Sequence, residues 1–331
     1  MRIVVTGGAG FIGSHFIRYI LKRYPSYHIL NIDKLTYAGN LENLKEVENN
    51  PHYAFLKEDI CNRSAIEEAI SGYDVIINFA AESHVDRSIS TPEIFLKTDI
   101  MGTLNLLEIS RLKGVKRYIQ ISTDEVYGSA EEGERFSEKS PLDPSSPYSA
   151  SKASADLLVL SYYRTYKLPT LIIRSTNNYG PNQYPEKFIP LFITNALEDK
   201  PLPLYGDGKN VRDWLFVLDN CKGIDIILHK GKEGEIYNIA GENERENIFI
   251  ARKILEYLGK QDSLIKFVKD RPGHDRRYSI SCEKVKKLGW SPEVSLEEGL
   301  RMTVDWYKNN QDWWKKIKSG EFLEYYRKHY G

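Results

Sequence analysis

The sequence has few of the features that assign a protein to a class at once. Its only cysteines are Cys61, Cys221 and Cys282, which are far apart and form no CxxC or metal-binding spacing. A sparse, odd set of this kind predicts neither a disulfide framework nor a zinc site, and it is typical of small core residues in a reducing compartment. Lysine plus arginine and aspartate plus glutamate both number 46, so no net charge favours nucleic acid.

Long apolar runs are also missing. No stretch of 18 apolar residues occurs, and the run Met1–Val5 before the first glycines is too short for a signal peptide. We therefore expect a cytoplasmic protein with no membrane or nucleic-acid partner and no metal. The 331 residues, 41% of them hydrophobic, suffice for one large or two modest domains.

The chain begins with a strand, a glycine turn and a helix. Residues 3–6 are β-branched, Gly7, Gly10 and Gly13 follow at GxxGxxG spacing, and apolar residues from Phe11 and Ile12 onward recur at helical intervals. Glycines let the backbone turn tightly and approach a pyrophosphate, which then rests on the N–H groups of the helix N-terminus. The alternative is an ordinary tight turn between a strand and a helix.

An acidic residue closes the second predicted strand, residues 28–33. Asp33 stands 20 residues after Gly13, where a carboxylate binds the adenosine ribose hydroxyls and repels the 2′-phosphate of NADP. The basic neighbour Lys34 would accept such a phosphate, and Asp33 could also serve only as a helix cap. We expect NAD as the cofactor.

Strands and helices continue to alternate along the first half. Further strands are predicted at residues 53–56, 74–81 and 117–123, and helices at residues 65–70 and 92–110. This order predicts an α/β fold with a doubly wound, Rossmann-type parallel sheet. The carboxyl ends of its strands should line one cleft.

The strand at residues 117–123 runs directly into Thr123-Asp124-Glu125. Two adjacent carboxyl groups at a strand end repel one another, which splits their pKa values and leaves one as an acid and the other as a base. The alternative is a threonine and an aspartate that only cap a helix.

A loop at residues 129–146, expected to cover the cleft, precedes a helix predicted over residues 147–166. Tyr148 and Lys152 lie four residues apart and share one face of this helix. We expect the lysine ammonium to lower the pKa of the phenol and make Tyr148 a base. YxxxK also occurs by chance.

The second half carries basic residues suited to a diphosphate. After a strand at residues 170–174, a helix opens within residues 184–191, and residues 211–217 with the helix from Asp219 return to the first domain. Lys187, Arg212 and Arg271 offer cationic donors, and Tyr205 offers a ring for a base. An internal salt-bridge mesh with Asp213, Asp270 and Asp275 is the alternative.

Together, the glycine spacing, Thr123 and Tyr148-x-x-x-Lys152 resemble the extended short-chain dehydrogenase/reductases. The pair Asp124-Glu125 and the run Ala80-Ala81-Glu82-Ser83-His84-Val85-Asp86 are similar to the dTDP-glucose 4,6-dehydratases of that family. His84 could equally be an ordinary loop histidine. The resemblance extends over essentially the whole chain, to Trp313-Trp314 and Tyr325-Tyr326. Glu246 departs from the threonine that the family usually carries there, which affects local loop hydrogen bonding.

The resemblance implies a reaction and a set of roles. NAD oxidises dTDP-glucose at carbon 4, water leaves from carbons 5 and 6, and the hydride returns to carbon 6. Tyr148, Thr123 and Lys152 would serve the oxidation, Glu125 would take the carbon 5 proton, and Asp124 would protonate the leaving hydroxyl.

The resemblance also implies binding residues. The cofactor would be bound by Gly7, Gly10, Phe11, Ile12, Gly13, Asp33, Lys34, Leu35, Thr36, Asp59, Ile60, Phe79, Ala80, Ala81, Ser83, Thr98, Tyr148, Lys152 and Asn178. The nucleotide sugar would be bound by Ser83, Thr123, Asn177, Lys187, Phe188, Pro203, Tyr205, Arg212, Asn247, Arg271 and His274.

We expect an NAD-binding domain of residues 1–177 plus about 211–239. A smaller, interleaved substrate-binding domain would comprise about 178–210 plus 240–331. By analogy with the family, the helices at residues 92–110 and 148–166 would pair in a four-helix homodimer interface. A nucleotide-sugar 4-epimerase, the same dehydration of UDP-glucose, and an idle redox sensor that binds the dinucleotide remain as alternatives.

Overall fold

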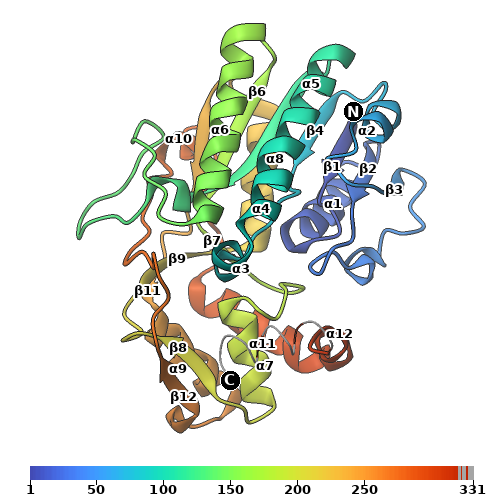
Figure 1. Cartoon of the computed structure of the whole chain (residues 1–331). Coiled ribbons are helices and arrows are strands. Elements are labelled where there is room, and N and C mark those ends of the chain that lie inside the picture. Colours follow the sequence, from blue (N-terminus) through green and yellow to red (C-terminus); the bar gives the residue numbers. More distant parts are fainter. Residues whose placement is uncertain (320–321, 323–325, 327–331) are drawn as a thin grey trace.

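A computed structural model describes residues 1–319, 322 and 326 of the chain (Figure 1). Tyr325, which the resemblance includes, lies outside the described residues. The main body is built on a seven-stranded sheet in the order β10-β6-β5-β4-β1-β2-β3, in which every pair of neighbours is parallel. This is the doubly wound, Rossmann-type sheet that the alternation of strands and helices predicts.

The strands of this sheet are mostly apolar because helices cover both of its faces. Their bounds are β1 (Arg2–Thr6), β2 (His28–Asp33), β3 (Tyr53–Lys57), β4 (Val75–Asn78), β5 (Arg117–Thr123), β6 (Thr170–Ser175) and β10 (Ile236–Ile239). Successive residues point to opposite faces: Val5 belongs to the core beneath one face, and Val4 to the core beneath the other.

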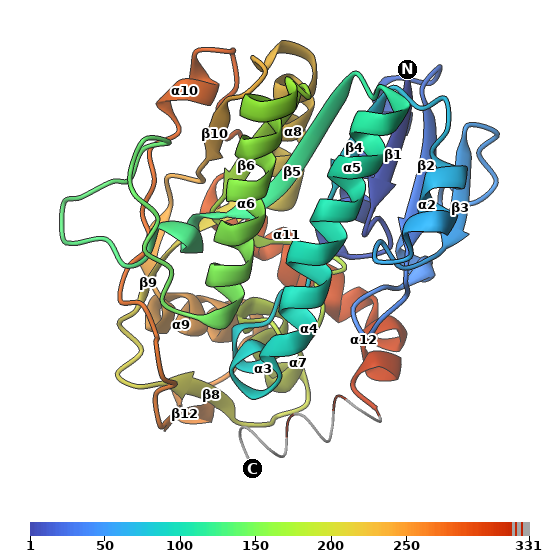
Figure 2. The same ribbon diagram turned by 45° about the horizontal axis from the view of Figure 1, so that its top comes forward.

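Helices α1 (Phe11–Arg23) and α8 (Val217–Lys230) pack together on one face, where Phe16 and Ile224 are fully buried. On the other face lie α2 (Arg63–Ala69), α5 (Thr103–Lys113) and α6 (Pro147–Tyr166), with Leu107 and Val159 in the core beneath them. Figure 2 shows α5 and α6 running side by side over the sheet.

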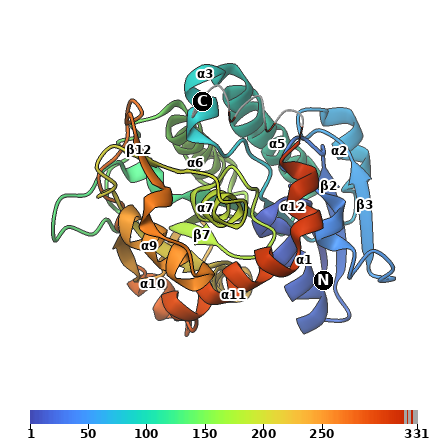
Figure 3. The same ribbon diagram turned by 90° about the horizontal axis from the view of Figure 1, so that it is seen from below.

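A second part of the chain has a core of its own below the carboxyl ends of the strands (Figures 1 and 3). It contains two small sheets, β11-β9-β7 and β12-β8. Its elements are β7 (Asn177–Tyr179), α7 (Phe188–Leu197), β8 (Leu202–Tyr205), β9 (Val211–Phe216), β11 (Glu244–Glu246), α9 (Asn247–Leu258), β12 (Ile265–Val268), α11 (Leu296–Asn309) and α12 (Gln311–Ile317).

The chain passes between the two parts more than once. After β9, α8 packs on α1 and β10 pairs with β6, so both belong to the main body. Later, α10 (Glu283–Lys286) packs against β10, and Cys282 and Trp290 join the core under the main sheet.

The helix predicted over residues 92–110 is wrong as a single regular helix. It comprises α4 (Pro92–Phe95), a π-helical segment (Leu96–Gly102) and α5, and it follows the separate helix α3 (Val85–Ser90). The spacing of apolar residues does not reveal a wider turn in a helix. Such turns are frequent at functional sites, and here the wide turn carries Thr98 of the cleft and Asp99.

Two further expectations need correction. The fourth strand ends at Asn78 instead of continuing to residue 81, because the chain then turns over the glycine loop: a Cβ on Gly7 would lie 2.6 Å from the backbone nitrogen of Ala80. The loop at residues 129–146 does not line the cleft. It is held beside residues 275–281 by backbone bonds from Phe136 to Ser279 and from Ser281 to Phe136.

In the part of the chain that the structure describes, no helix combines the length and the apolar character needed to cross a bilayer.

The close approach at Gly7 gives a test of the turn. Gly7 has φ +69, and an added Cβ would meet backbone atoms of Phe79 and Ala80. Gly114, at the C-terminus of α5, has a similar φ of +63 but open space around it. Gly114→Ala should lower the free energy of unfolding by about 1–2 kcal/mol, because a left-handed backbone conformation is unfavourable for alanine. Gly7→Ala should lower the free energy of unfolding, measured with urea, by clearly more than Gly114→Ala. Equal losses in the two variants would show that the close contact between Gly7 and Ala80 is unimportant.

Candidate active site

The site is a cleft at the carboxyl ends of six parallel strands of the main sheet. Gly7 follows β1, Asp33 ends β2, Asp59 follows β3, Phe79 follows β4, and Thr123 and Ser175 end β5 and β6. All of the residues predicted to bind the cofactor line this cleft except Leu35. The topology of a parallel sheet brings these ends together although they are far apart in the sequence.

The glycine turn forms a cradle at one end of the cleft. A Cβ on Gly13 would lie 2.5 Å from the Gly7 carbonyl oxygen, so the turn leaves no room for a side chain there. Helix α1 begins directly after Gly10 without a side-chain cap. Its first N–H groups therefore suit an anion such as a pyrophosphate.

Asp33 both organises the neighbouring backbone and lines the cleft. Its carboxylate accepts hydrogen bonds from the backbone N–H groups of Ala9 (2.9 Å) and Leu35 (2.8 Å). Leu35 contributes this bond from a left-handed conformation, and it does not reach the cleft. The Lys34 ammonium lies 2.7 Å from Asp59, and this pairing reduces its availability to a 2′-phosphate.

The Tyr148–Lys152 pair is placed by the start of α6. Ser146 caps the helix: its hydroxyl accepts a bond from the Ser149 N–H, and the Ser149 hydroxyl accepts one from the Ser146 N–H. The buried Lys152 ammonium donates to the carbonyl oxygen of Ile121 at 2.7 Å. Burial lowers the pKa of Lys152, whereas Asp99 and Asp156 favour its charged form.

The expectation that Tyr148 has a lowered pKa is wrong for the protein alone. Burial raises the pKa of Tyr148 well above its ordinary value, and the carboxylates of Glu125 and Asp99 raise it further. A hydrogen bond with Thr123 acts in the opposite direction. The sequence spacing places Lys152 near Tyr148, but it does not show how many acids surround the phenol.

Asp124 and Glu125 have different surroundings. Burial raises the pKa of Asp124 well above its ordinary value, and Glu125 and Asp213 add to the rise. One Asp124 oxygen is 3.3 Å from the Thr123 hydroxyl, and the other is buried without a hydrogen-bond partner in the described structure. These surroundings favour the protonated form of the Asp124 carboxyl group.

Glu125 faces a more cationic environment. Burial raises its pKa, but Arg271, Arg212 and Lys187 act against that rise. The Tyr278 hydroxyl lies 3.3 Å from one of its oxygens. Of the two acids, Glu125 is therefore the one that ionises first. Thr123 also caps the short helix that begins at Asp124, by accepting a bond from the Glu125 N–H at 3.2 Å, so the capping role coexists with the acid pair.

A second pocket continues the cleft into the smaller part of the chain. The two share Ser83, Glu125, Asn177 and Lys187, so Glu125 lies where they meet, and Asp124 lines the first cleft beside it. Every residue predicted to bind the nucleotide sugar lines this second pocket except Thr123, which lies in the first.

Of the three basic residues predicted for the second pocket, Arg212 and Lys187 form no ion pair with an acid within the described residues, whereas Arg271 pairs with Asp86 at 3.2 Å. The hydrogen bonds of the Arg212 guanidinium in the described structure go to the backbone carbonyls of Val211 (2.7 Å) and Asp275 (3.0 Å). The Lys187 ammonium donates to the Ser83 carbonyl. Asp213 is instead bonded by backbone N–H groups of residues 242 and 243.

Several lining residues were not predicted. The first cleft also contains Glu82, Gln183 and Tyr184, and the second contains Asp86, Glu186, Trp214 and Tyr278. Most of them stand beside predicted site residues, and this adjacency is the signal that could have found them. Within the described residues, no group of three or more histidine, cysteine or acidic side chains is arranged to hold a metal.

Comparisons with known proteins agree with this geometry. The family model described as GDP-mannose 4,6 dehydratase matches residues 4–303. A dTDP-glucose 4,6-dehydratase of Neisseria meningitidis serogroup B is 47% identical, with 97% of each chain covered.

Two solved structures are also similar. The dTDP-glucose 4,6-dehydratase of Bacillus anthracis, in complex with NAD, is 52% identical, covers 96% of this chain and 100% of its own, and superposes with a TM-score of 0.90. DesIV of Streptomyces venezuelae, a dTDP-glucose 4,6-dehydratase with NAD and TYD bound, is 48% identical with the same coverage and a TM-score of 0.94.

The electrostatics of Tyr148 can be tested directly. Glu125→Gln removes the larger of the carboxylate contributions that raise the Tyr148 pKa. The phenol should then ionise at a lower pH, because its anion no longer faces that charge. Carbon-13 NMR of ring-labelled tyrosine, with the signal assigned through Tyr148→Phe, measures the shift. An unchanged or raised pKa would contradict the arrangement.

Proposed function

The chain belongs to the GDP-mannose 4,6-dehydratase family, and on that basis we propose that it dehydrates dTDP-glucose to dTDP-4-keto-6-deoxyglucose. It is then a hydro-lyase that uses tightly held NAD without net oxidation. The observation that carries the proposal is the adjacent pair of buried Asp124 and half-buried Glu125, of which Glu125 lines both the dinucleotide cleft and the cation-lined pocket.

The residues of the first cleft fit NAD. The Gly7–Gly13 turn would hold the pyrophosphate, Asp33 the adenosine ribose, and Lys152 and Tyr148 the nicotinamide ribose. When bound, NAD accepts a hydride from the sugar, returns it later, and brings a positive charge that favours the phenolate of Tyr148.

Tyr148 acts on the oxidation step. Its phenolate takes the proton of the 4-hydroxyl while Thr123 hydrogen-bonds the same oxygen, and carbon 4 becomes a ketone as its hydride departs. The ketone acidifies the proton on carbon 5. Because Tyr148 has a raised pKa in the protein alone, we infer that it becomes an effective base only in the loaded site.

The acid pair acts on the elimination. Ionised Glu125 removes the proton from carbon 5, and protonated Asp124 gives its proton to the departing 6-hydroxyl, which leaves as water. The double bond that forms between carbons 5 and 6 would then accept the hydride at carbon 6, while Glu125 returns its proton to carbon 5. Exchange with solvent would take up the proton that Tyr148 gained and restore the one that Asp124 gave. The opposed surroundings of the two carboxyl groups suit these roles at neutral pH.

The alternatives make less use of the site. A 4-epimerase needs Tyr148 and Lys152 but has no step for an acid pair at carbons 5 and 6. A redox sensor that only binds the dinucleotide needs neither the Tyr148–Lys152 pair nor the acid pair. The thymidine nucleotide is supported by the names of the relatives, and UDP-glucose remains the alternative substrate.

The remaining assignments follow from the same basis. We propose that residues 1–177 and about 211–239 hold NAD, and that about 178–210 and 240–331 bind the nucleotide sugar. Two segments depart from these bounds: β9 (Val211–Phe216) contributes Trp214 and Phe216 to the core of the second part, and Cys282, Val285 and Trp290 pack in the core of the main body. A cytoplasmic location accords with Cys61, Cys221 and Cys282, which are all free thiols.

Incubation of the purified protein with dTDP-glucose tests the proposed function. A 4-keto-6-deoxy product identifies the dehydratase, dTDP-galactose would identify an epimerase, and bound NAD without turnover would identify a sensor. A parallel incubation with UDP-glucose compares the two bases.

The acid pair should serve elimination and not oxidation. Asp124→Asn cannot donate the proton and Glu125→Gln cannot accept one, so product formation should fall by about 10²–10⁴-fold in each. The first hydride transfer should survive better, so NADH should accumulate after mixing with substrate, seen as near-ultraviolet absorbance. In Tyr148→Phe, NADH should not accumulate, because the oxidation step has lost its base. Near-normal turnover of Glu125→Gln would overturn the assignment.

We also propose a homodimer through the helices that cover the outer face of the main body. Large apolar side chains are exposed there on α3, the π-helical segment and α6, which pack together: Ile89 (41%), Leu96 (50%), Met101 (50%) and Leu157 (58%). Exposed apolar side chains gathered on one face mark an interaction surface.

Leu157→Lys should therefore weaken the dimer, since it would bury an ammonium in an apolar interface. Phe267→Lys is the matched control, because Phe267 is also exposed (61%) but lies on β12 of the second part. Sedimentation at micromolar concentration should give a dimer for the parent and the control and a larger monomer fraction for Leu157→Lys. A monomeric mass for the unmodified protein would contradict the proposed homodimer.

A further inference from the structure

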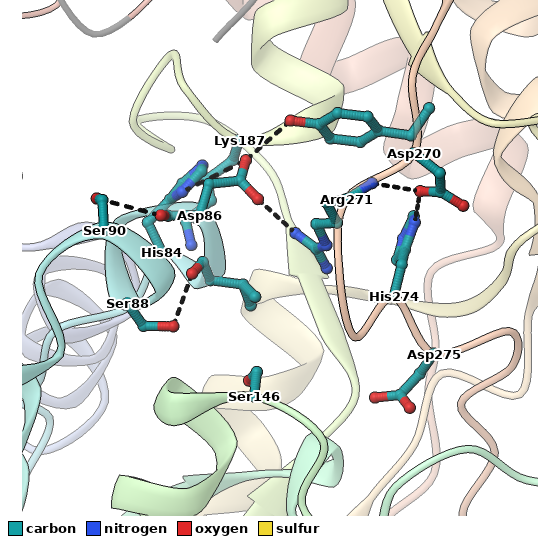
Figure 4. A network of polar contacts seen from close by, with 12 residues as sticks. His84, Asp86, Ser88, Ser90, Ser146, Lys187, Asp270, Arg271, His274 and Asp275 are labelled. Carbon is teal, nitrogen blue, oxygen red and sulfur yellow. Dashed lines mark hydrogen bonds and ion pairs between the residues drawn. The ribbon is translucent and has the colours of Figure 1, made fainter. Parts of the chain in front are cut away.

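Asp86 is a buried carboxylate that the proposed reaction does not use. It lies in the first turn of α3, on the main body, and its side chain is 6% exposed. One of its oxygens is 3.2 Å from a terminal guanidinium nitrogen of Arg271, and the other accepts the Tyr205 hydroxyl at 3.0 Å. Figure 4 shows Asp86 between His84 and Arg271.

The two partners of Asp86 come from separate elements of the smaller part. Tyr205 ends β8, and Arg271 lies in the irregular segment after β12. Both line the second pocket. A single carboxylate on the main body therefore ties together two side chains that the pocket presents to its ligand.

Asp86 is charged in this setting. Burial raises the pKa of Asp86, but His84, Arg271 and the Tyr205 hydroxyl together bring it below its ordinary value. Burial lowers the pKa of His84 to about 4, with Glu186, Lys187, Asp86 and Arg271 as the charged groups around it, so the imidazole is neutral at pH 7. At that pH Arg271 is paired with Asp86, and the charge of Asp86 also favours the charged form of Lys187.

The bond to Asp86 leaves part of the Arg271 guanidinium available. Its Nε is buried and has no hydrogen-bond partner in the described structure. The Arg271 backbone N–H is held by the Asp270 carboxylate at 2.9 Å, so the residue is fixed at its backbone and at one end of its fork. An arginine prepared in this way binds a phosphate without first losing its side-chain freedom.

We propose that Asp86 is a positioning residue, whose carboxylate holds Arg271 and Tyr205 in the arrangement that binds the nucleoside diphosphate of the substrate. This rests on the proposed function for the identity of the ligand. Asp86 acts through Arg271, and its effect belongs to binding and not to hydride transfer or elimination.

The test is a double-mutant cycle read by calorimetric binding of dTDP to the NAD-loaded protein. Asp86→Asn keeps the size and an acceptor for Tyr205 but removes the charge that holds Arg271. It should raise the Kd for dTDP about tenfold, as expected for a charge-assisted hydrogen bond. Turnover at saturating dTDP-glucose should change by less than about threefold, because the acid pair and Tyr148 are untouched.

Arg271→Lys keeps the positive charge but loses the paired N–H donors of the planar guanidinium, so it should also weaken dTDP binding. In an Arg271→Gln background, which removes the cation that pairs with Asp86, Asp86→Asn should add less than about a twofold further change. Additive losses would show a direct contact between Asp86 and the ligand and would overturn the proposal. A lower Kd in Asp86→Asn would also overturn it, by showing competition with the diphosphate.

Asp225→Asn is the matched control. Asp225 is likewise buried, accepts the hydroxyls of Tyr19 (2.9 Å) and Tyr24 (3.2 Å) and pairs with Arg23 (3.3 Å), but it lies between α1 and α8, away from both pockets. It should lower the melting temperature and leave the Kd for dTDP unchanged. If Asp86→Asn does not fold, Tyr205→Phe removes the other bond to Asp86 and should raise the Kd by a smaller factor.

These measurements separate the inference from the proposed function. Turnover of dTDP-glucose by the parent protein tests the function alone. A normal parent with an unchanged Kd in both Asp86→Asn and Tyr205→Phe would refute the positioning role and leave the function standing.

Discussion

Two carboxyl groups that are adjacent in the chain and buried together cannot both be charged without compensation. Asp124 and Glu125 are in this situation, and Asp213 lies close enough to raise the Asp124 pKa further. The cations that favour ionised Glu125 are Arg271, Arg212 and Lys187, all from the smaller part of the chain. The two acids follow a strand of the main sheet, and the cations that favour the ionised form of Glu125 come from the second part.

Much of this arrangement could be predicted from residue patterns. The bounds predicted for β2, β5 and α6 are confirmed, because these elements have strong local signals: β2 ends in Asp33, β5 is followed directly by Asp124, and a serine followed by proline begins α6. The cleft could be predicted from topology, since the ends of parallel strands must meet at one edge of the sheet. Asp33 lines the cleft, and its carboxylate also accepts hydrogen bonds from the backbone N–H groups of Ala9 and Leu35.

The features that could not be predicted depend on contacts between distant segments. The Tyr148 pKa is raised by Glu125, Asp99 and Asp124 from two other elements, whereas the sequence pattern offers only Lys152, four residues away. The π-helical turn at Leu96–Gly102 has no local signal, because its apolar spacing is that of an ordinary helix. The Arg271 guanidinium pairs with Asp86, 185 residues earlier, whereas the adjacent Asp270 accepts a hydrogen bond from the Arg271 backbone N–H.

The position of β10 also bears on how the protein is made. β10 (Ile236–Ile239) completes the main sheet by pairing with β6, but β6 itself ends at Ser175. On a ribosome that adds about 5–20 residues per second, six strands emerge several seconds before the seventh. During that interval the edge of β6 presents unpaired backbone groups, which is the surface that recruits wrong partners in nascent chains. The segment between β6 and β10 includes β7, α7, β8, β9 and α8. A chaperone that shields this edge during synthesis would therefore protect the newly made sheet until β10 arrives.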